Sequence, residues 1–581
     1  MEAPEEAVLG AVGVDVGVAV AAAGDRVVVV DLHHQPPGAE PLHDQLGVGV
    51  RAEHVLPGSV ELAHDPDDRE VRDRTDRPGH GRHLARRAAA GTATAIGCST
   101  DNFAVRPNGL VSVNATDNTW ASAGTTRTLV NGSAGGGNVH KAGQPFTLRA
   151  TGQNASGITT SNYNGSPTIK TLTCTLPTPT CANGVLTPGT WSAASGIVTT
   201  TTAAYSEAGS FNLTLEDQTF AAVDSADSTL LERTIPQAAA ITVGRFVPDH
   251  FIIATNNTPA FKTFNVADSA CSTLPRSFTY VGQPFGYVTS PQALVTAQNA
   301  ANITTTNYRG NLWKISTAVP SDITQTYANN PVKPLDTTLT GLPTVTPNND
   351  GTGTVTANAS DVIGFTRSLT TPDAPFVADL SLTMSVVDDS EAGANQGTIT
   401  TTAPGAVFNG GGSGIAFDAG NAFRYGRLKL ANTHGSELLN LPIPMETQYW
   451  NGTTFVTNAE DHCTTIVPGN VLISNPRKNL AISETGITVS GAFLNGKSTN
   501  LRLNKPSGGD GIYNGSVDIC VDLGVDTPSA AAPLCVATTP ANQPWLQGKW
   551  SETNYDDDPV ARGTFGIYKN SNEIIYMREI Y

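Results

Sequence analysis

Charged residues are scarce in this sequence. Only 15% of the 581 residues are Asp, Glu, Lys or Arg, and aromatic residues make up 6%. Basic residues are the rarer of the two signs, because 34 Lys and Arg stand against 51 Asp and Glu, giving a formal net charge of −17. A nucleic-acid-binding protein needs a basic surface to contact phosphates. The composition therefore argues against nucleic acid as a partner.

Long apolar runs are also missing. No stretch of 18 or more apolar residues occurs, so no transmembrane segment is expected. No GxSxG, Walker A, dinucleotide-binding or HExxH pattern occurs in a supporting strand and helix context. We therefore expect a protein that is not an enzyme and that has no cofactor. Thr, Asn, Gly and Ser are abundant instead, and this mixture disfavours helices and is typical of exported all-β proteins.

Residues 1–95 differ in composition from the rest. They contain seven of the eleven His and no Lys, Asn, Ile, Phe, Tyr or Trp. The missing residues have AT-rich codons, so we interpret this segment as a mispredicted start or an off-frame stretch of a GC-rich gene. The alternative is a genuine low-complexity leader. Residues 11–30 imitate a signal peptide, but Asp15, Asp25 and Arg26 interrupt them and no base precedes them, so no signal peptide is visible. We expect disorder here.

Two sequence blocks occur twice, in the same order. GQPF stands at residues 143–146 and 282–285, and QNASGITTSNYNG at 153–165 corresponds to QNAANITTTNYRG at 298–310. Two independent blocks in one order indicate a tandem duplication. Short alternating segments, such as the one with Leu380, Leu382, Met384 and Val386, and frequent Asn-Gly pairs favour β-sandwiches.

The predicted fold class is all-β, with tandem immunoglobulin-like β-sandwich domains and a C-terminal β-domain. The expected domains are residues 96–243 for the first repeat, 244–404 for the second and 405–581 for the C-terminal domain. The glycine-rich residues 410–414 are the expected flexible joint before the third region.

The cysteines favour local disulfides. The seven are Cys98, Cys174, Cys181, Cys271, Cys463, Cys520 and Cys535. Cys174 and Cys181 flank a short loop, Cys520 and Cys535 flank a longer one, and neither pair has the tight spacing of zinc or redox sites. We expect two bridges formed in an oxidising compartment. A third bridge between Cys271 and Cys463 would leave Cys98 unpaired, and small buried thiols are the alternative.

Carboxylates cluster at two places, Asp388, Asp389 and Glu391, and residues 556–558. Calcium binding or paired-acid catalysis needs carboxyl groups that converge, whereas neighbours in a strand point to opposite faces. Solvated turns are the default expectation, and no metal is expected. The neighbours Asp461, His462 and Cys463 contain a base and a thiol, but a bridged Cys463 could not act as a nucleophile.

Residues 423–457 have the clearest β-pattern. Leu428 and Leu430 alternate with basic residues, which predicts a half-buried strand. Pro442 and Pro444 lack backbone donors, so the segment containing them should lie at a sheet edge. Asn451-Gly452 predicts a two-residue hairpin turn directly after Tyr449 and Trp450. Tyr449 and Trp450 are candidate glycan contacts, although aromatic residues of β-proteins more often belong to the core.

Several stretches resemble one known family. They are VGRFVPDHF at residues 243–251, the segment 423–457, and WLQGKW, DPVARGTFGIYK and IIYMREIY within residues 545–581. They resemble the C-terminal region of the MSHA biogenesis protein MshQ family, a domain of unknown function from Gram-negative bacteria, and the resemblance covers residues 96–581. It implies a surface protein encoded with a type IV pilus of the mannose-sensitive haemagglutinin (MSHA) type. It supplies no catalytic residues.

These patterns together lead to one function hypothesis and two alternatives. We expect a non-enzymatic extracytoplasmic protein, at the cell surface or outer membrane, that takes part in biogenesis or decoration of an MSHA-type pilus, with adhesion as one role. Its expected partners are pilus or other cell-surface proteins. The alternatives are a carbohydrate-binding surface module that contacts glycans and, third, a secreted hydrolase.

Overall fold

The computed structural model describes residues 103–117, 126–264, 276–391, 397–525, 534–551 and 553–566. Three two-residue strands come earlier in the chain: β1 (Ala21–Ala22), β2 (Val27–Val28) and β3 (His80–Gly81), of which β3 pairs with β4 (Phe103–Ala104). The expectations for residues 1–95 lie outside the described residues. The three β-domains below belong to one compact unit, residues 76–581.

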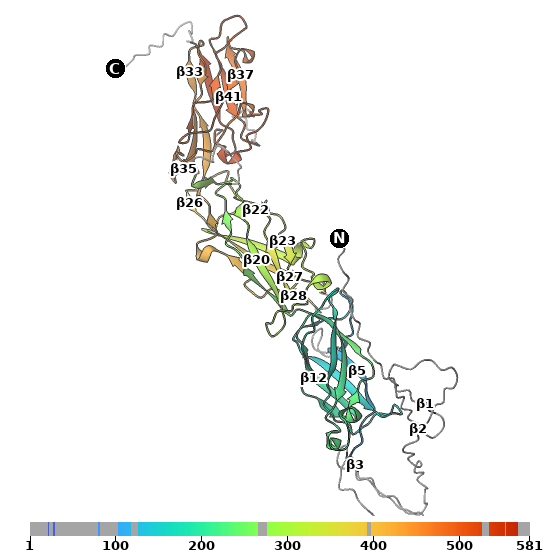
Figure 1. Ribbon diagram of the computed structural model, residues 1–581. Helices are drawn as coiled ribbons and strands as arrows, with labels where there is room; N and C mark the ends of the chain where they lie inside the picture. The colour runs from blue at the N-terminus through green and yellow to red at the C-terminus, as the bar shows by residue number, and fades with distance from the viewer. Residues whose placement is uncertain are drawn as a thin grey trace, which may run out of the picture. The chain divides into compact units, whose positions relative to one another are not determined.

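The first sandwich consists of two sheets (Figure 1). One sheet has the order β10 (Leu186–Thr187), β12 (Ile197–Tyr205), β8 (Phe146–Gln153), β5 (Gly109–Asp117) and β6 (Arg127–Thr128), with β11 (Ser192–Ala194) beside β12. The other has the order β14 (Ile235–Pro236), β13 (Gly209–Asp217), β15 (Ile241–Val247) and β7 (His140–Lys141), with β9 (Thr168–Leu176) beside β13. Two helical turns, η1 (Ala222–Asp224) and α1 (Leu230–Arg233), join β13 to β14. Leu148 of one sheet and Phe211 of the other are fully buried in a shared core.

The second sandwich is assembled from short sheets. One sheet has the order β16 (His250–Thr255), β20 (Gln292–Gln298), β24 (Thr352–Thr356) and β23 (Thr344–Pro347), and a second has β21 (Ile323–Asn330), β27 (Asp379–Asp388) and β28 (Ile399–Thr400), with β29 (Ala406–Phe408) beside β27. Two three-stranded sheets have the orders β19 (Tyr287–Thr289), β17 (Ala260–Phe261), β30 (Ala416–Phe417) and β18 (Phe278–Tyr280), β31 (Ala422–Arg424), β26 (Phe376–Val377). The remaining pair is β22 (Leu335–Leu339) with β25 (Val362–Phe365). Its single-turn helices are η3 (Gly310–Leu312), η4 (Pro320–Asp322) and η6 (Gly410–Gly412).

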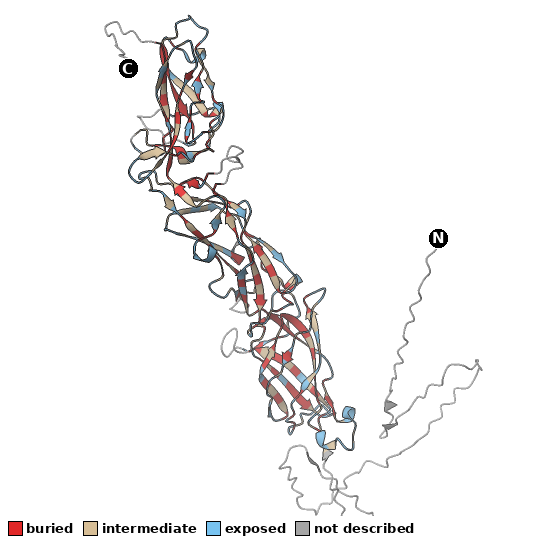
Figure 2. Cartoon of the chain, turned by 60° about the vertical axis from the view of Figure 1, so that its left-hand side comes forward, coloured by how far each residue is buried: buried red, intermediate tan, exposed pale blue. Residues whose placement is uncertain are grey.

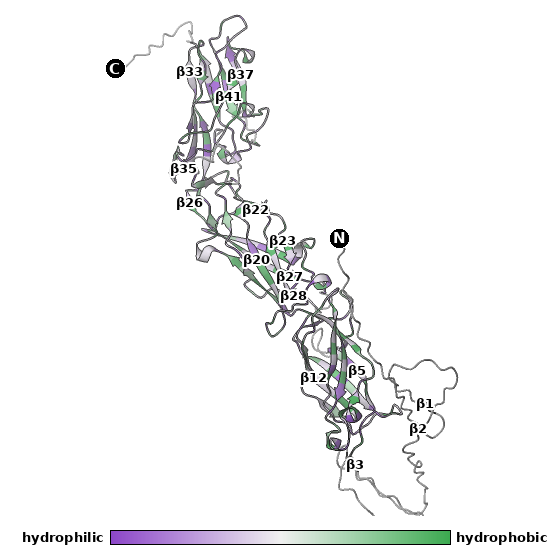
Figure 3. Cartoon of the chain, in the orientation of Figure 1, coloured by the Kyte–Doolittle hydropathy of each residue, from purple (hydrophilic) through white to green (hydrophobic). Residues whose placement is uncertain are grey.

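Strand β27 shows why these segments are strands. Every second residue of it is buried, including Leu380, Leu382, Met384 and Val386, and the residues between them are half-buried. Because side chains of a strand alternate between its two faces, this spacing places one face in the core. The same banding runs along strands of every domain in Figure 2, and Figure 3 shows hydrophobic and hydrophilic residues alternating along them.

The duplication inferred from the two sequence blocks is visible in the hydrogen bonds. The hydroxyl of Tyr163 donates to Asp217 at 2.9 Å in the first sandwich, and the hydroxyl of Tyr308 donates to Asp388 at 2.7 Å in the second. Strand β7 pairs in parallel with β15, as β18 pairs in parallel with β31. Sequence and hydrogen-bond pattern therefore repeat together.

In its described residues, the C-terminal domain has three sheets around a third core. Their orders are β32 (Gly426–Leu430), β35 (Met445–Trp450), β36 (Phe455–Thr457), with β39 (Lys497–Ser498) on β35; β33 (Thr433–Gly435), β42 (Val560–Phe565), β41 (Gly515–Val521), β37 (Val471–Lys478); and β34 (Leu441–Pro442), β40 (Arg502–Leu503), β38 (Ile487–Thr488). Single turns η7 (Pro468–Asn470), η8 (Ile482–Glu484) and η9 (Pro544–Leu546) join them. The predicted fold class, tandem immunoglobulin-like β-sandwiches followed by a C-terminal β-domain, is confirmed for the described residues.

The strand predictions for residues 423–457 hold, with one correction. Leu428 and Leu430 are buried in β32, and β34 lies at the edge of its sheet. A hairpin joins β35 to β36, but Trp450 pairs with Phe455, so the loop has four residues and not two. The Asn451 side chain accepts hydrogen bonds from the amides at positions 453 and 454, and this cap holds the longer loop.

The glycine-rich residues 410–414 are not a joint between domains. They connect β29 to β30, and both strands pair with strands of the second sandwich. The Asn409 side chain accepts a hydrogen bond from the Gly411 amide, which caps the turn. The chain enters the C-terminal domain later, between β31 and β32. Among the described residues, no helix is long and apolar enough to cross a membrane.

Candidate functional site

Tyr449 and Trp450, the candidate glycan contacts, are half-buried in β35 and already contact protein groups. The Arg424 guanidinium lies 4.8 Å from the centre of the Tyr449 ring. The rings of Trp450 and Phe455 meet edge to face at 5.3 Å. Glycan binding by Tyr449 and Trp450 stays a prediction.

The two expected disulfides are present. Cys174 is bonded to Cys181 and Cys520 to Cys535. Cys463 is also disulfide-bonded, which removes its thiol as a nucleophile. Its expected pairing with Cys271 involves a residue outside the described part of the chain.

The acidic clusters are mostly buried, contrary to the expectation of solvated turns. Asp557 is 1% exposed and accepts hydrogen bonds from the amide and hydroxyl of Ser551 at 2.7 and 2.6 Å. Asp388 is 3% exposed and bonds to Tyr308, whereas Asp389 is exposed. Burying a carboxylate is costly unless donors surround it, and these loops provide them. Within the described residues, no group of three or more His, Cys, Asp or Glu is placed to hold a metal ion.

Several buried polar residues lie where the two sandwiches meet. Glu207, between β12 and β13 of the first sandwich, is 9% exposed. Its carboxylate accepts hydrogen bonds from the amide and hydroxyl of Thr306 and from the amide of Asn307, all at 3.0 Å. Three donors on one carboxylate form a charge-assisted contact between the domains.

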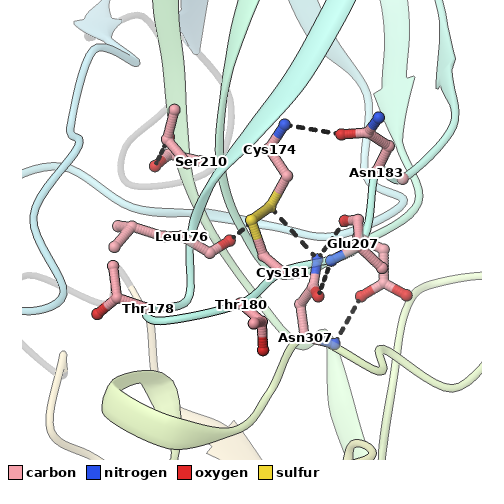
Figure 4. The surroundings of a disulfide bond; sticks show 12 residues. Cys174, Leu176, Thr178, Thr180, Cys181, Asn183, Glu207, Ser210 and Asn307 are labelled. Carbon is pink, nitrogen blue, oxygen red and sulfur yellow. Dashed lines mark hydrogen bonds between the residues drawn. A yellow bond between two sulfur atoms is a disulfide. The ribbon is translucent and has the colours of Figure 1, made fainter. Parts of the chain in front are cut away.

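Asn307 completes this contact on the other side (Figure 4). It is fully buried, its Oδ1 accepts from the Ala182 amide at 2.9 Å, and its Nδ2 donates to the Ala182 carbonyl at 2.8 Å. Nδ2 also lies 3.8 Å from the Sγ of Cys174. The Cys174–Cys181 disulfide ties Cys181, the residue directly before Ala182, to β9, so it helps to fix the position of these backbone groups.

The duplicated block in the second sandwich supplies further bonds across the junction. The Asn299 side chain donates to the Ser206 carbonyl at 2.9 Å, and the Ala300 amide donates to the Ala142 carbonyl at 3.0 Å. Gly143 has φ +80°, and a Cβ there would lie 2.9 Å from the Ala300 amide nitrogen. The glycine of the first GQPF block is therefore required by this close approach.

A buried ion pair crosses the same junction. Arg245 of β15 is 1% exposed and pairs with Glu391, which follows β27 in the second sandwich. Its other terminal nitrogen donates to the Ser133 carbonyl at 2.6 Å. Burial lowers the pKa of Arg245, and the charge of Glu391 opposes that shift. Removing one partner would leave an uncompensated buried charge.

At the junction between the second sandwich and the C-terminal domain, an arginine occupies the position that corresponds to Glu207 of the first sandwich. The bridge between Phe285 and Ile363 corresponds to the pairing of Phe146 with Ala203, so Arg367 stands where Glu207 stands in the first sandwich. Arg367 donates to the carbonyls of Tyr555, Gly426 (3.0 Å) and Gln547 (2.8 Å). Its guanidinium lies 4.2 Å from the centre of the Tyr425 ring. Burial lowers the pKa of Arg367 to about 10.

Two stretches of the sequence match family descriptions. Residues 207–412 match the third domain of DUF6701, and residues 424–580 match the fourth. The DUF6701 third-domain match begins at Glu207, so the carboxylate that binds the second sandwich lies within that match.

Other comparisons add little. A search of the curated proteins finds no significant match. The solved structures include FdeC, an Escherichia coli adhesin, at 11% identity and a TM-score of 0.21, covering 68% of this chain and 94% of that one. They also include invasin, a bacterial integrin-binding protein, at 11% identity and a TM-score of 0.18, covering 66% of this chain and 55% of that one. Likenesses this weak say nothing about the role of the DUF6701 domains.

Sequence reasoning missed the residues at the two junctions. The GQPF and QNA blocks were found as a repeat, yet their polar residues gave no sign of contacting another domain. The repetition of Asn and Thr at fixed places was the available signal, but Asn and Thr are also typical turn residues. Glu207 and Arg367 lie outside both blocks and gave no signal of their own.

Proposed function

We propose that this protein is a non-enzymatic, extracytoplasmic β-scaffold of the cell surface that works with a type IV pilus of the MSHA type. The observation that carries the proposal is the use of its buried polar groups. Glu207, Asn307, Arg245 and Arg367 each bind backbone or side-chain groups of the neighbouring β-domain. Buried polar contacts between domains suit a protein whose function is to hold a binding surface in a fixed position.

The disulfides support a location outside the cytoplasm. Structural disulfides form and persist in oxidising compartments and are rare in the cytosol. The Cys174–Cys181 bridge lies beside the junction that Glu207 and Asn307 form. In a reducing compartment Cys181 would be released from Cys174, and the neighbouring Ala182, which binds Asn307, would lose this support.

The pilus is the part of the proposal that comes from the family resemblance. The stretches at residues 243–251, 423–457 and 545–581 resemble the MSHA biogenesis protein MshQ family, whose members are encoded with such a pilus. Biogenesis or decoration of the pilus, with adhesion as one role, is the function we assign. No catalytic step is assigned to the chain.

The test uses the bacterium that produces the protein. The gene is deleted and then complemented, and three quantities are measured: digestion of the protein by protease added to intact cells, the amount of pilin sheared from the surface, and adherence of the cells. We expect digestion without lysis, and a loss of sheared pilin or of adherence that complementation restores. A protein protected until lysis would contradict the surface location. Unchanged pilin and adherence would contradict the link to the pilus.

A further inference from the structure

The two copies of the duplicated block fold into the same loop. In residues 154–165 the Asn154 Oδ1 accepts from the amides of Ser156 and Ile158 at 3.0 and 2.9 Å. In residues 299–310 the Asn299 Oδ1 accepts from the amides at positions 301 and 303 at 2.9 and 3.0 Å. Both loops also have a residue with positive φ at the fourth position, Gly157 at +78° and Asn302 at +61°. The loops therefore present the same groups in the same geometry.

The loop of the second sandwich is occupied. Its Thr306 and Asn307 donors bind the Glu207 carboxylate, and the Asn299 Nδ2 binds the Ser206 carbonyl. Asn299 and Asn307 are 2% and 0% exposed as a result. The end of the first sandwich is thus the ligand of this loop.

The loop of the first sandwich has the same donors without these contacts. Ser161 stands at the place of Thr306 and Asn162 at the place of Asn307, and both are exposed. Among the described residues, the Ser161 amide and hydroxyl, the Asn162 amide and side chain and the Asn154 Nδ2 have no hydrogen-bond partner. A carboxylate placed as Glu207 is placed would satisfy the first three of these donors.

The chain also enters the two sandwiches in the same way. The Asn108 amide donates to the Gln153 carbonyl at 2.7 Å, and the Asp249 amide donates to the Gln298 carbonyl at 2.7 Å. A proline precedes each, Pro107 in one case and Pro248 in the other. At Pro248 the segment just before the proline is the last strand of the docked sandwich, β15. An occupant of the first loop can therefore be joined at Pro107 with the same geometry.

Charge decides which end of a β-domain fits. The loop of residues 154–165 offers hydrogen-bond donors, so it suits an end that carries an acidic residue, as the first sandwich does with Glu207. The second sandwich carries Arg367 at the matching place, and that residue requires carbonyl acceptors. A cation against the Ser161 and Asn162 donors would be repelled by their dipoles.

We propose that residues 154–165 are a docking site for the acidic end of another β-sandwich of this kind. The occupant presents a carboxylate to Ser161 and Asn162 and a backbone carbonyl to Asn154, and it is joined through Pro107. The first sandwich is then an internal member of a series, docked at both of its ends. The proposed contact is independent of where the protein works and of any pilus.

The first experiment asks whether the free loop can dock, and it uses the full chain. Ala301→Ser, Asn302→Gly, Thr306→Ser and Arg309→Asn together give residues 299–310 the sequence of residues 154–165. Amide hydrogen exchange is followed by mass spectrometry in peptides covering residues 300–308. We expect the protection of wild type to be kept within about fivefold, and lost by about tenfold or more when Glu207→Ala is added. Loss of protection in the variant with these four substitutions and with Glu207 intact would overturn the proposal.

The second experiment supplies the occupant. Residues 1–106 are replaced by an additional copy of residues 107–247, so that Val247 of the added copy is followed by Pro107. Exchange in peptides covering residues 155–163 should slow by about tenfold or more relative to the unmodified chain. Glu207→Lys in the added copy alone should abolish this slowing, and Glu216→Gln there should not. If the amides of the added copy are protected, so that it has folded, but Ser161 and Asn162 still exchange as fast as in the unmodified chain, the proposal is wrong. If the added copy does not fold, the first experiment tests the proposal by itself.

Discussion

Replacing Glu207 by alanine should loosen the contact between the two sandwiches. The Glu207 carboxylate is nearly buried and holds three donors at 3.0 Å from Thr306 and Asn307. Hydrogen bonds to a charged group contribute about 1.5–3 kcal/mol each, and bonds that share one carboxylate add up incompletely. Thr306 is exposed and can bind water in the variant, whereas Asn307 is buried. We therefore expect a loss of about 3 kcal/mol in the free energy of opening the contact.

Amide hydrogen exchange measures this loss locally, which suits a chain of several domains because global unfolding would not be two-state. The Asn307 amide should exchange about 150-fold faster in Glu207→Ala. Glu207→Gln keeps one acceptor oxygen and should give about a tenfold increase. Glu216→Gln is the matched control, because Glu216 lies in the same domain and its pair with Lys170 is 4.0 Å long.

One result would refute the reasoning about this junction. If the Asn307 amide exchanges in Glu207→Ala at the rate measured for Glu216→Gln, the carboxylate does not hold the loop. Faster exchange throughout both sandwiches would instead show that Glu207 stabilises its own domain.

The other predictions concern the fold. Tyr308→Phe removes the donor 2.7 Å from buried Asp388 and should cost about 1–3 kcal/mol in the second sandwich, measured as faster hydrogen exchange of the most protected amides of that sandwich. Removing the bridge by Cys520→Ala with Cys535→Ala frees a loop of 15 residues and should cost about 3 kcal/mol in the C-terminal domain; unchanged hydrogen exchange of the most protected amides of that domain would contradict this. Burial raises the pKa of Asp361 above its usual 3.8, so the folded chain binds that proton more tightly and stability falls as pH rises from 3.8 through the folded pKa. Asp361→Asn should therefore gain stability relative to wild type as pH rises above 3.8, and a difference independent of pH would count against the buried charge.

Much of the fold was predictable from the sequence. The alternation of residues in β27 and β32 identified strands and their buried faces, because a strand has a period of two. The two repeated blocks identified a duplicated domain before any contact was known. Spacing also indicated the two disulfides, since each pair flanks a single loop.

The junctions could not be predicted in the same way. Glu207 and Asn307 are 100 residues apart, and the contact depends on how one folded domain meets the next. Asn, Thr and Gly are also typical turn residues, so residues 299–310 had a sufficient local explanation. The Asn451-Gly452 turn shows the same limit on a smaller scale, because the Asn451 side chain selected a longer loop than the dipeptide predicted.

A double-mutant cycle between Glu207 and Thr306 tests the docking contact most directly. Thr306→Val removes the hydroxyl that donates to the Glu207 carboxylate at 3.0 Å and keeps the shape of the side chain. Opening free energies at the Asn307 amide are measured for wild type, Glu207→Ala, Thr306→Val and the double variant. A direct contact predicts a coupling energy of about 1 kcal/mol or more. Additive effects, with no coupling, would contradict the claim that this carboxylate joins the two sandwiches.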